Sequence, residues 1–414
     1  MTADNRQVLV TGGVQPGFEK VAQLFQQELA RNPGGGAVCV YHQGKPVVDL
    51  WGGVRDRAGT PWAQDTLSVS FSTSKGVAAT LLHQLVAAGD VQYDKPVRHY
   101  WPEFAARGKG NITVEDLLTH RAGMHNIRDL GLHFDDLHDW DTVTRKLAGA
   151  PAEPRDNHSI YHALTFGWLV GEIIRRVTGE PFAERVQSAL ATPLNADGLF
   201  IGVPSAEHHR VADLLMGRAP DAPRRKPGAG KRAQKALQRE LFRNISRLAR
   251  VGLAPDFSAF EKSVAVPGFN AARLTEPRQL SAAMPAFNGA FTARSLARLY
   301  AALANDGELD GQRILAPGIA ASLGEQKVST LDRSLYTPMR WRLGYHQPFV
   351  LRRRRPRQAF GHFGFGGSGA WADPARKLSV ALTVNAGTGT PWGDMRILRI
   401  GAAALDAAEK QRPA

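Results

Sequence analysis

The sequence contains a single cysteine and lacks several features that define common classes of protein. Cys39 has no partner for an internal disulfide, and its apolar surroundings at 37–40 predict a buried strand position. No apolar stretch approaches the roughly 18–20 residues that a membrane-spanning helix requires. The first residues do not combine a basic region with a following apolar one, so no secretory signal is recognised. We therefore expect a cytoplasmic protein.

Sequence motifs typical of metal sites, nucleotide sites and α/β-hydrolases are also missing. The 13 histidines form neither an H-E-x-x-H motif nor a cluster with cysteine, so no metal site is indicated. No G-x-G-x-x-G follows a first strand, and no cofactor is expected. The nearest approach to the G-x-S-x-G motif of α/β-hydrolases is at 366–370, where alanine replaces the last glycine. These absences argue against that fold.

Positive charge is abundant and is concentrated in one segment. The net charge is +14, and 224–250 contributes +9 of it, with ten lysines and arginines against the single acid Glu240. A helix drawn over 231–252 places four apolar residues on one face: Leu237, Leu241, Ile245 and Leu248. This pattern favours a solvated helix packed on its own domain. The alternative is a weak contact with an anionic membrane surface, which would make the protein peripheral to a membrane. Nucleic-acid binding is not expected, because no recognised motif accompanies the charge.

Predicted elements follow the order helix, strands, a long helical stretch, strands and helix. The clearest are a helix over 17–31, strands over 37–42, 46–51, 362–372 and 378–384, and helices over 163–178 and 292–304. We expect an α/β protein of the α+β type, with one antiparallel sheet flanked by terminal helices. The sheet domain would comprise 1–90 and 324–414, and a helical domain over 91–323 would carry a basic insert at about 218–252.

Ser72 and Lys75 form an S-x-x-K motif at the start of a helix predicted to run to about Ala88. Positions i and i+3 share a helix face, so the hydroxyl and the amine can meet. A serine becomes a good nucleophile when a neighbour takes its proton, and a lysine whose pKa is lowered by burial can do so. A chain of this length contains S-x-x-K by chance roughly every second time, so the motif alone is weak.

Two further segments could carry chemistry. Tyr161 stands just before an amphipathic helix, where a phenol can pass a proton beside a cation, although such a tyrosine is more often a hydrogen-bonded, half-buried residue. The segment 361–369 is rich in glycine on a β background. Glycines within a strand mark a place where another backbone or a ligand approaches closely, and the alternative is a plain glycine-rich loop.

In this order, the three segments resemble the serine β-lactamase and penicillin-binding-protein superfamily. The resemblance is closest to class C β-lactamases and to the family VIII carboxylesterases, which share their fold. The S-x-x-K motif corresponds to Ser72 and Lys75, the Y-x-N motif to 161–163, and the K-T-G motif to 362–364. The resemblance covers about residues 30–390. It implies a β-lactamase/transpeptidase-like fold.

Two departures from the family pattern bear on the activity. Ala163 replaces the asparagine of Y-x-N, and His362 replaces the lysine of K-T-G. In β-lactamases those groups help to hold the amide and carboxylate of the antibiotic. The departures therefore favour hydrolysis of a small-molecule ester or lipid with a short-to-medium acyl chain. The alternatives are β-lactamase or D-alanyl-D-alanine carboxypeptidase activity, or an inactive scaffold or lipid-surface-binding protein.

The resemblance also implies a role for each site residue. Ser72 would become acylated, while Lys75 and Tyr161 would handle its proton, and either of the two could be the base. The backbone N–H groups of Ser72 and Phe365 would hold the oxyanion. His362 and Gly364 would line the substrate site.

Overall fold

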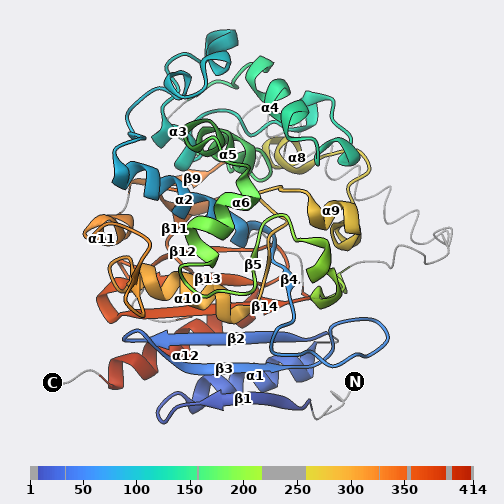
Figure 1. Ribbon diagram of the computed structural model, residues 1–414, viewed down its shortest axis with the longest axis vertical. Coiled ribbons are helices and arrows are strands. Elements are labelled where there is room, and N and C mark those ends of the chain that lie inside the picture. The colour runs from blue at the N-terminus through green and yellow to red at the C-terminus, as the bar shows by residue number, and fades with distance from the viewer. Residues whose placement is uncertain are drawn as a thin grey trace.

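Figure 1 shows a computed structural model of the protein, which describes residues 8–32, 34–155, 158–216, 258–325, 327–351, 356–387 and 394–411. Its centre is a nine-stranded antiparallel sheet. The strands lie in the order β1 (Val10–Val14), β3 (Lys45–Gly52), β2 (Gly36–His42), β14 (Leu378–Val384), β13 (Gly369–Asp373), β12 (Phe360–Phe363), β11 (Tyr345–His346), β10 (Thr337–Arg342) and β9 (Val328–Asp332). The two ends of the chain meet where β2 pairs with β14. The predicted fold class is thereby confirmed.

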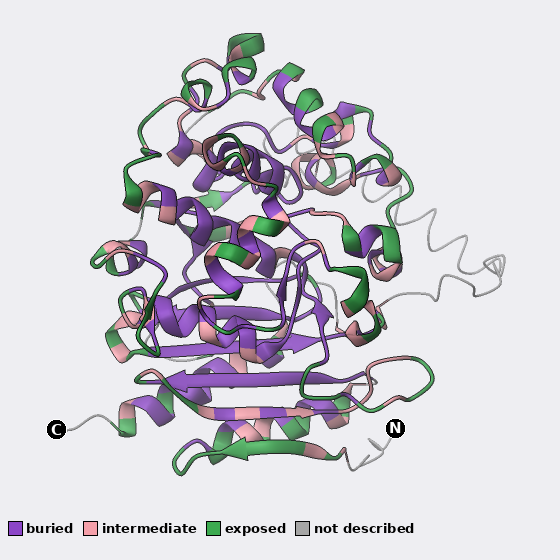
Figure 2. Cartoon of the chain, viewed as in Figure 1, coloured by how far each residue is buried: buried purple, intermediate pink, exposed green. Residues whose placement is uncertain are grey.

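The central strands are buried because helices cover both faces of the sheet (Figure 2). Successive side chains of a strand point to opposite faces. Val38 and Val40 of β2 accordingly join the apolar core beneath α1 (Glu19–Arg31) and α12 (Met395–Lys410). Cys39 and Tyr41 join the core that includes α10 (Ala293–Ala304). Cys39 is a fully buried strand residue, as predicted, and burial raises the pKa of its thiol.

The remaining helices occupy the middle of the sequence. They are α2 (Ser74–Ala88), α3 (Val114–Leu118), α4 (Trp140–Gly149), α5 (Thr165–Thr178), α6 (Phe182–Val186), α8 (Ser258–Val264), α9 (Pro277–Ser281) and α11 (Ile319–Leu323). Helix α10 lies within the range 91–323 yet packs against β2, β13 and β14, so this part of the range belongs to the sheet. The basic segment 224–250 lies outside the described residues. Over the described ranges, no helix is both long enough and apolar enough to cross a membrane.

The single strand predicted over 362–372 is wrong in one respect, because the chain turns in its middle. Strand β12 ends at Phe363, and β13 begins at Gly369 as its antiparallel partner. The turn between them contains Gly366 and Gly367, with φ angles of 113° and 110°. Such angles are readily adopted only by glycine. A periodic pattern of β-forming residues does not reveal this reversal.

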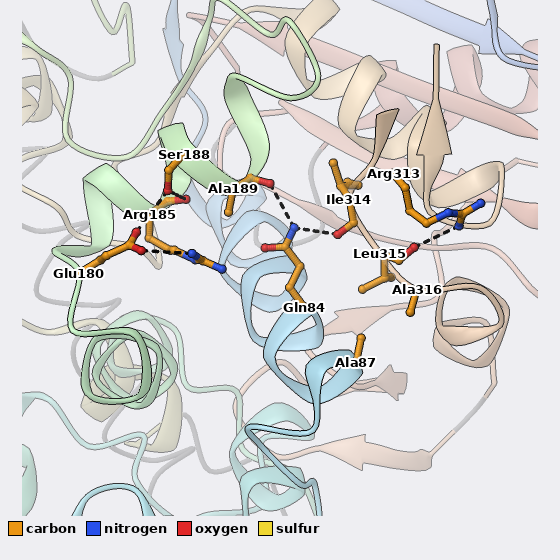
Figure 3. A pocket seen from close by; sticks show the side chains of 10 residues that line it. All are labelled: Gln84, Ala87, Glu180, Arg185, Ser188, Ala189, Arg313, Ile314, Leu315 and Ala316. Atoms are coloured by element: carbon orange, nitrogen blue, oxygen red, sulfur yellow. Dashed lines mark hydrogen bonds and ion pairs between the residues drawn. The ribbon is translucent and has the colours of Figure 1, made fainter. Parts of the chain in front are cut away.

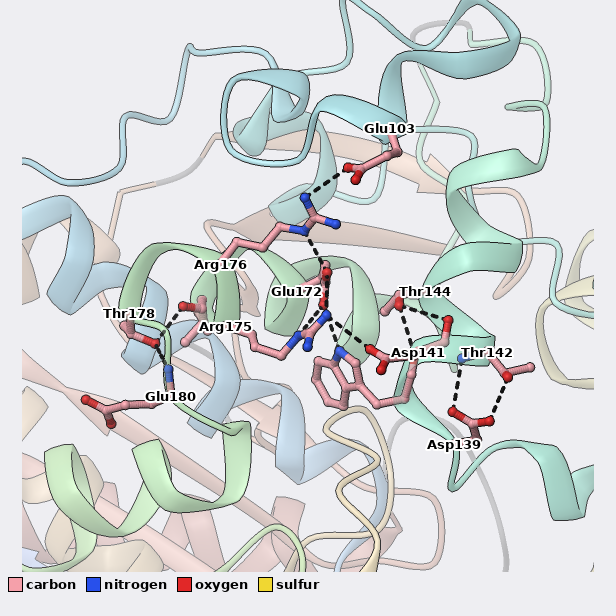
Figure 4. A network of polar contacts seen from close by, with 12 residues as sticks. Glu103, Asp139, Asp141, Thr142, Thr144, Glu172, Arg175, Arg176, Thr178 and Glu180 are labelled. Carbon is pink, nitrogen blue, oxygen red and sulfur yellow. Dashed lines mark hydrogen bonds and ion pairs between the residues drawn. The ribbon is translucent and has the colours of Figure 1, made fainter.

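A buried carboxylate joins the helices of the middle region (Figure 4). Glu172 of α5 accepts hydrogen bonds from Arg175 Nε at 2.8 Å, Arg176 Nε at 2.7 Å and Trp140 Nε1 of α4 at 2.7 Å. Arg176 also pairs with Glu103 at 2.9 Å. Burial alone would raise the pKa of Glu172, but these hydrogen bonds outweigh it and keep the pKa low. The network fixes α5, which begins directly after the segment that carries Tyr161.

Candidate active site

Ser72 lies at the head of α2, in a 3₁₀ turn over Phe71–Thr73 that follows β4 (Ser68–Val69). Strand β4 pairs with β6 (Ala290–Phe291), and the Ser70 N–H donates to the Gly289 carbonyl at 2.8 Å. Phe71 has a φ of 48°, which is unusual for a bulky residue and must be held by its surroundings. The predicted helix therefore begins at Ser74, and Ser72 occupies the tight turn before it.

Lys75 is fully buried beneath Ser72 and makes three hydrogen bonds. Its Nζ donates to Ser72 Oγ at 3.0 Å, to the Ala163 carbonyl at 2.7 Å and to the Ala286 carbonyl at 2.9 Å. Burial lowers the pKa of Lys75 well below its ordinary value. When Lys75 is neutral, its two N–H groups can serve the two backbone carbonyls, and its lone pair faces Ser72 Oγ and can accept the Ser72 proton. The structure thus brings the two members of the S-x-x-K motif into direct contact.

Tyr161 lies on the other side of this pair. Lys75 Nζ is 4.9 Å from the centroid of its ring, which also stacks on Trp341 at 5.6 Å and 9°. Burial raises the pKa of Tyr161, and the nearby Ser72 side chain acts in the opposite direction. The phenol nevertheless forms no hydrogen bond of normal geometry within the described part of the chain. Its hydroxyl is therefore available to a bound substrate.

The backbone of Tyr161 is held by a buried carboxylate that sequence reasoning did not identify. Asp332 Oδ1 accepts hydrogen bonds from the N–H of Tyr161 at 3.3 Å and from Ser334 Oγ at 2.7 Å. Its Oδ2 accepts one from Ser159 Oγ at 2.8 Å, and Ser159 in turn accepts one from Trp341 Nε1 at 2.8 Å. Asp332 and Trp341 lie far beyond Tyr161 in the chain. No local pattern links them to it.

The glycine-rich segment reaches the same place from the sheet. A Cβ on Gly364 would collide with the carbonyl oxygen of Ser70, just before the site serine. The predicted close approach of another backbone is therefore confirmed. His362 is buried, its ring centroid is 6.1 Å from that of Tyr161, and burial lowers its pKa, so the imidazole is neutral. Phe365 is exposed at 38% and packs edge-on against Phe71 at 5.8 Å.

An apolar cavity of about 260 Å³ adjoins Ser72 and Tyr161. Its walls are mainly aromatic and aliphatic: Phe71, Ala163, Leu164, Phe260, Val264, Phe269, Ala271, Phe287 and Phe365. Of the described residues that line it, only Ser72 and Tyr161 have polar side chains. The segment 260–271 was not predicted to reach the site, because it follows the basic segment in the sequence and has no recognisable motif.

A second, larger cavity of about 430 Å³ lies at the opposite end of α2 (Figure 3). Its two arginines are already paired, Arg185 with Glu180 at 3.3 Å and Arg313 with Glu308. Its described lining includes one hydroxyl, that of Ser188, with no lysine or histidine beside it. No group of three or more metal-ligating side chains occurs among the residues with assigned positions. Ser72 and the groups around it are therefore the candidate active site.

Comparison with known proteins places the chain in a family. The family model described as Beta-lactamase matches residues 21–405, so the chain belongs to the β-lactamase family. It is 38% identical over 381 residues to the esterase/beta-lactamase LipL of Mycobacterium tuberculosis, covering 91% of this chain and 83% of that protein. It is 30% identical over 223 residues to the esterase EstB of Burkholderia gladioli, covering 50% and 56% of the two chains.

Solved structures agree with this assignment. The crystal structure of a family VIII carboxylesterase has a TM-score of 0.82 at 31% identity and covers 96% of this chain and 100% of its own. A penicillin-binding-protein homologue from Caulobacter crescentus has a TM-score of 0.77 at 32% identity, with the same coverage. The predicted superfamily and the β-lactamase/transpeptidase-like fold are confirmed.

Proposed function

We propose that the protein hydrolyses small-molecule carboxylic esters through an acyl-enzyme on Ser72. The chain is a carboxylesterase-like serine hydrolase, as its family and relatives indicate. The observation that carries the residue assignment is the 3.0 Å hydrogen bond between Lys75 Nζ and Ser72 Oγ at the buried head of α2. This contact joins a potential nucleophile to a proton acceptor.

In the proposed reaction, Ser72 Oγ attacks the ester carbonyl and its proton passes to a neighbouring base. The lowered pKa of Lys75 favours a neutral amine, and the raised pKa of Tyr161 favours a neutral phenol. These opposite shifts support Lys75 as the acceptor. The departing alkoxide takes a proton from Tyr161, and the proton that Lys75 received from Ser72 then restores the phenol, so that both groups end uncharged. Water then hydrolyses the acyl-enzyme. The backbone N–H groups of Ser72 and Phe365 would hold the oxyanion, and one such donor typically contributes about 3–4 kcal/mol.

His362 and Gly364 are proposed to shape the substrate site. The neutral imidazole of His362 donates through Nδ1 to the Phe363 carbonyl at 3.1 Å, and its buried Nε2 has no partner in the described structure. His362 is not among the described residues that line the cavity beside Ser72, so a hydrogen bond between this nitrogen and the substrate stays a prediction. Gly364 lets the end of β12 approach the backbone before Ser72. Both assignments rest on the geometry around Ser72.

The second candidate is hydrolysis of a β-lactam or a D-alanyl-D-alanine peptide, as the name of the mycobacterial relative includes β-lactamase. Such substrates carry a carboxylate. The described lining of the cavity includes no cationic side chain, and Ala163 supplies no amide to it. These observations favour the ester. An inactive scaffold is disfavoured by the hydrogen bond between Ser72 and Lys75.

We expect Ser72→Ala to lower the turnover of p-nitrophenyl butyrate by at least about 1,000-fold, because the nucleophile is lost while the fold remains. Ser188→Ala, at an exposed serine, is the matched control and should keep full activity. A fluorophosphonate probe should label the wild type and the control only. Nitrocefin measured in parallel decides between the two substrate classes. Retention of more than a few per cent of esterase activity by Ser72→Ala excludes the proposed nucleophile.

A further inference from the structure

One wall of the cavity beside Ser72 is formed by residues that have no role in the proposed reaction. Phe260 and Val264 of α8 line it, one helical turn apart, and both pack against the apolar cluster that contains Tyr161, Ala163 and Trp341. Residues four apart share one face of a helix. A single face of α8 is therefore turned toward the reacting groups.

Helix α8 is fixed in place by polar contacts on its other side. Lys262 Nζ pairs with Glu153 Oε1 at 2.6 Å, and the Lys262 carbonyl accepts a hydrogen bond from the N–H of Ile127 at 3.0 Å. Just beyond the helix, the Pro267 carbonyl accepts one from the N–H of Phe134 at 2.8 Å. These contacts tie α8 to three other segments of the chain. The wall is thus positioned independently of any ligand.

The size of the cavity limits what it can hold. Pockets for drug-sized ligands begin at about 300 Å³, whereas this one measures about 260 Å³. We therefore expect it to favour a short chain or a small ring whose carbonyl stays at Ser72. Phe260 and Val264 line this space, so a longer chain would compete with their side chains for it.

The charge of the cavity limits its ligands further. Among the described residues that line it, the side chains are hydrocarbon apart from the hydroxyls of Ser72 and Tyr161. Moving a carboxylate from water into such surroundings is very unfavourable unless a cation accompanies it. Lys75 cannot serve as the accompanying cation, because its amine is already engaged with Ser72 and two backbone carbonyls.

We propose that Phe260 and Val264 form a neutral, length-limiting acyl pocket, which selects esters with short uncharged acyl chains and rejects those whose acyl chain ends in a carboxylate. The assignment rests on the proposed function of Ser72. We assign the acyl group to this pocket because it becomes bonded to Ser72 in the first half-reaction and stays there until water releases it, whereas the alcohol leaves between the two half-reactions.

The charge selectivity is tested with two esters of matched length. p-Nitrophenyl butyrate and mono-p-nitrophenyl succinate share a four-carbon acyl chain, and only the second ends in a carboxylate. We expect kcat/KM to be at least about 100-fold higher for the butyrate, as an unpaired charge would have to be buried. Val264→Lys should narrow this ratio by at least tenfold. Equal turnover of the two esters by the wild type overturns the proposal.

The length limit is tested with a series of p-nitrophenyl esters from acetate to decanoate. Phe260→Ala should raise kcat/KM for the longer esters by at least tenfold and change it less than about threefold for acetate. The matched control is Phe349→Ala, since Phe349 packs against the same cluster but does not line the cavity. Val264→Ala is the second variant if Phe260→Ala has a lowered melting temperature.

The outcomes separate this inference from the proposed function. If wild type and variants hydrolyse acetate through Ser72 but share one chain-length profile, α8 does not limit the acyl group. A parallel series of alkyl butyrates tests the alcohol group. If the variants change only the preference for the alcohol, the pocket holds the alcohol and the proposal is wrong. Absence of Ser72-dependent hydrolysis of every ester contradicts the proposed function itself.

Discussion

Lys75 and Tyr161 are both buried, yet burial shifts their pKa values in opposite directions. Burial disfavours the charged form of any group, so the lysine loses its proton more readily and the tyrosine keeps its proton more firmly. At neutral pH the pair therefore tends toward an amine and a phenol, both uncharged. Two short motifs in the sequence identify these residues, but the direction of each shift depends on the packing around them.

Buried histidines make the stability of the protein sensitive to acid. Burial lowers the pKa of His83 on α2 and of His346 on β11 to about 4, from an ordinary value of 6.5. Because the unfolded chain binds more protons between these values, the free energy of unfolding falls as the pH drops from about 6.5 to about 4. A shift of this size contributes roughly 3 kcal/mol for each histidine.

We expect urea unfolding to show a much lower midpoint at pH 4.5 than at pH 7. His83→Gln should reduce this difference, because a glutamine side chain cannot take up a proton. His99→Gln is the matched control, since His99 is exposed, and it should leave the difference unchanged. A wild-type protein whose stability does not change between these pH values contradicts the argument.

Helix α5 depends on one buried carboxylate for its contacts with α4 and with the turn containing Glu103. Glu172 has a side chain exposed at only 1%, and its arginine partners are exposed at 30% and 38%. Removing one member of a buried ion pair costs roughly 3–5 kcal/mol, and partial exposure of the partners reduces this cost. We expect Glu172→Ala to lower the free energy of unfolding by about 2–3 kcal/mol, as measured by urea denaturation.

Glu184→Ala on α6 is the control for this prediction, because that side chain is exposed and should change the stability by less than about 0.5 kcal/mol. The esterase activity of folded Glu172→Ala should remain, since Glu172 does not contact Ser72 or its cavity. If Glu172→Ala is as stable as the wild type, the network of Figure 4 does not hold α5 in place.

The net charge of the whole molecule leads to a separate prediction about membrane binding. The segment 224–250 contributes +9 of the net charge of +14, but it lies outside the described residues. A peripheral contact of this segment with an anionic membrane surface therefore stays a proposal. A cytoplasmic location of the protein also stays a proposal. We expect vesicles containing anionic lipid to bind the protein at low salt and to release it at high salt. Neutral vesicles are the control. Failure to bind anionic vesicles at low salt rules out the contact.

The division of the chain into a sheet domain and a helical domain also remains a proposal. Helix α10 packs on the sheet although it lies far from the chain ends, and α2 packs against both α5 and strands β11 and β12. Boundaries inferred from runs of predicted elements do not anticipate these contacts of α10 with the sheet. The reason is that amphipathic periodicity reveals which face of a helix is buried but not which partner buries it.

Local patterns were sufficient for most central elements. The apolar runs of β2 and β14, the terminal helices and the cap of α10 at Thr292 follow from composition and periodicity. Strands β1, β9 and β10 are missing from the prediction, because β1 is largely exposed and the other two mix exposed with buried residues. A strand at or next to the edge of a sheet is defined by its neighbours in the sheet more than by its own sequence.

The sequence by itself determined which residues could react: Ser72 and Lys75 share one helical turn, and the glycines at 361–369 permit a close approach. Only the tertiary structure decided their surroundings. Asp332, Trp341 and Phe260 are distant in the chain, and only folding brings them to Tyr161 or the cavity beside it. Hydrogen bonds and apolar contacts are short-ranged, so residues far apart in sequence can act together only once the sheet and helices have placed them within reach.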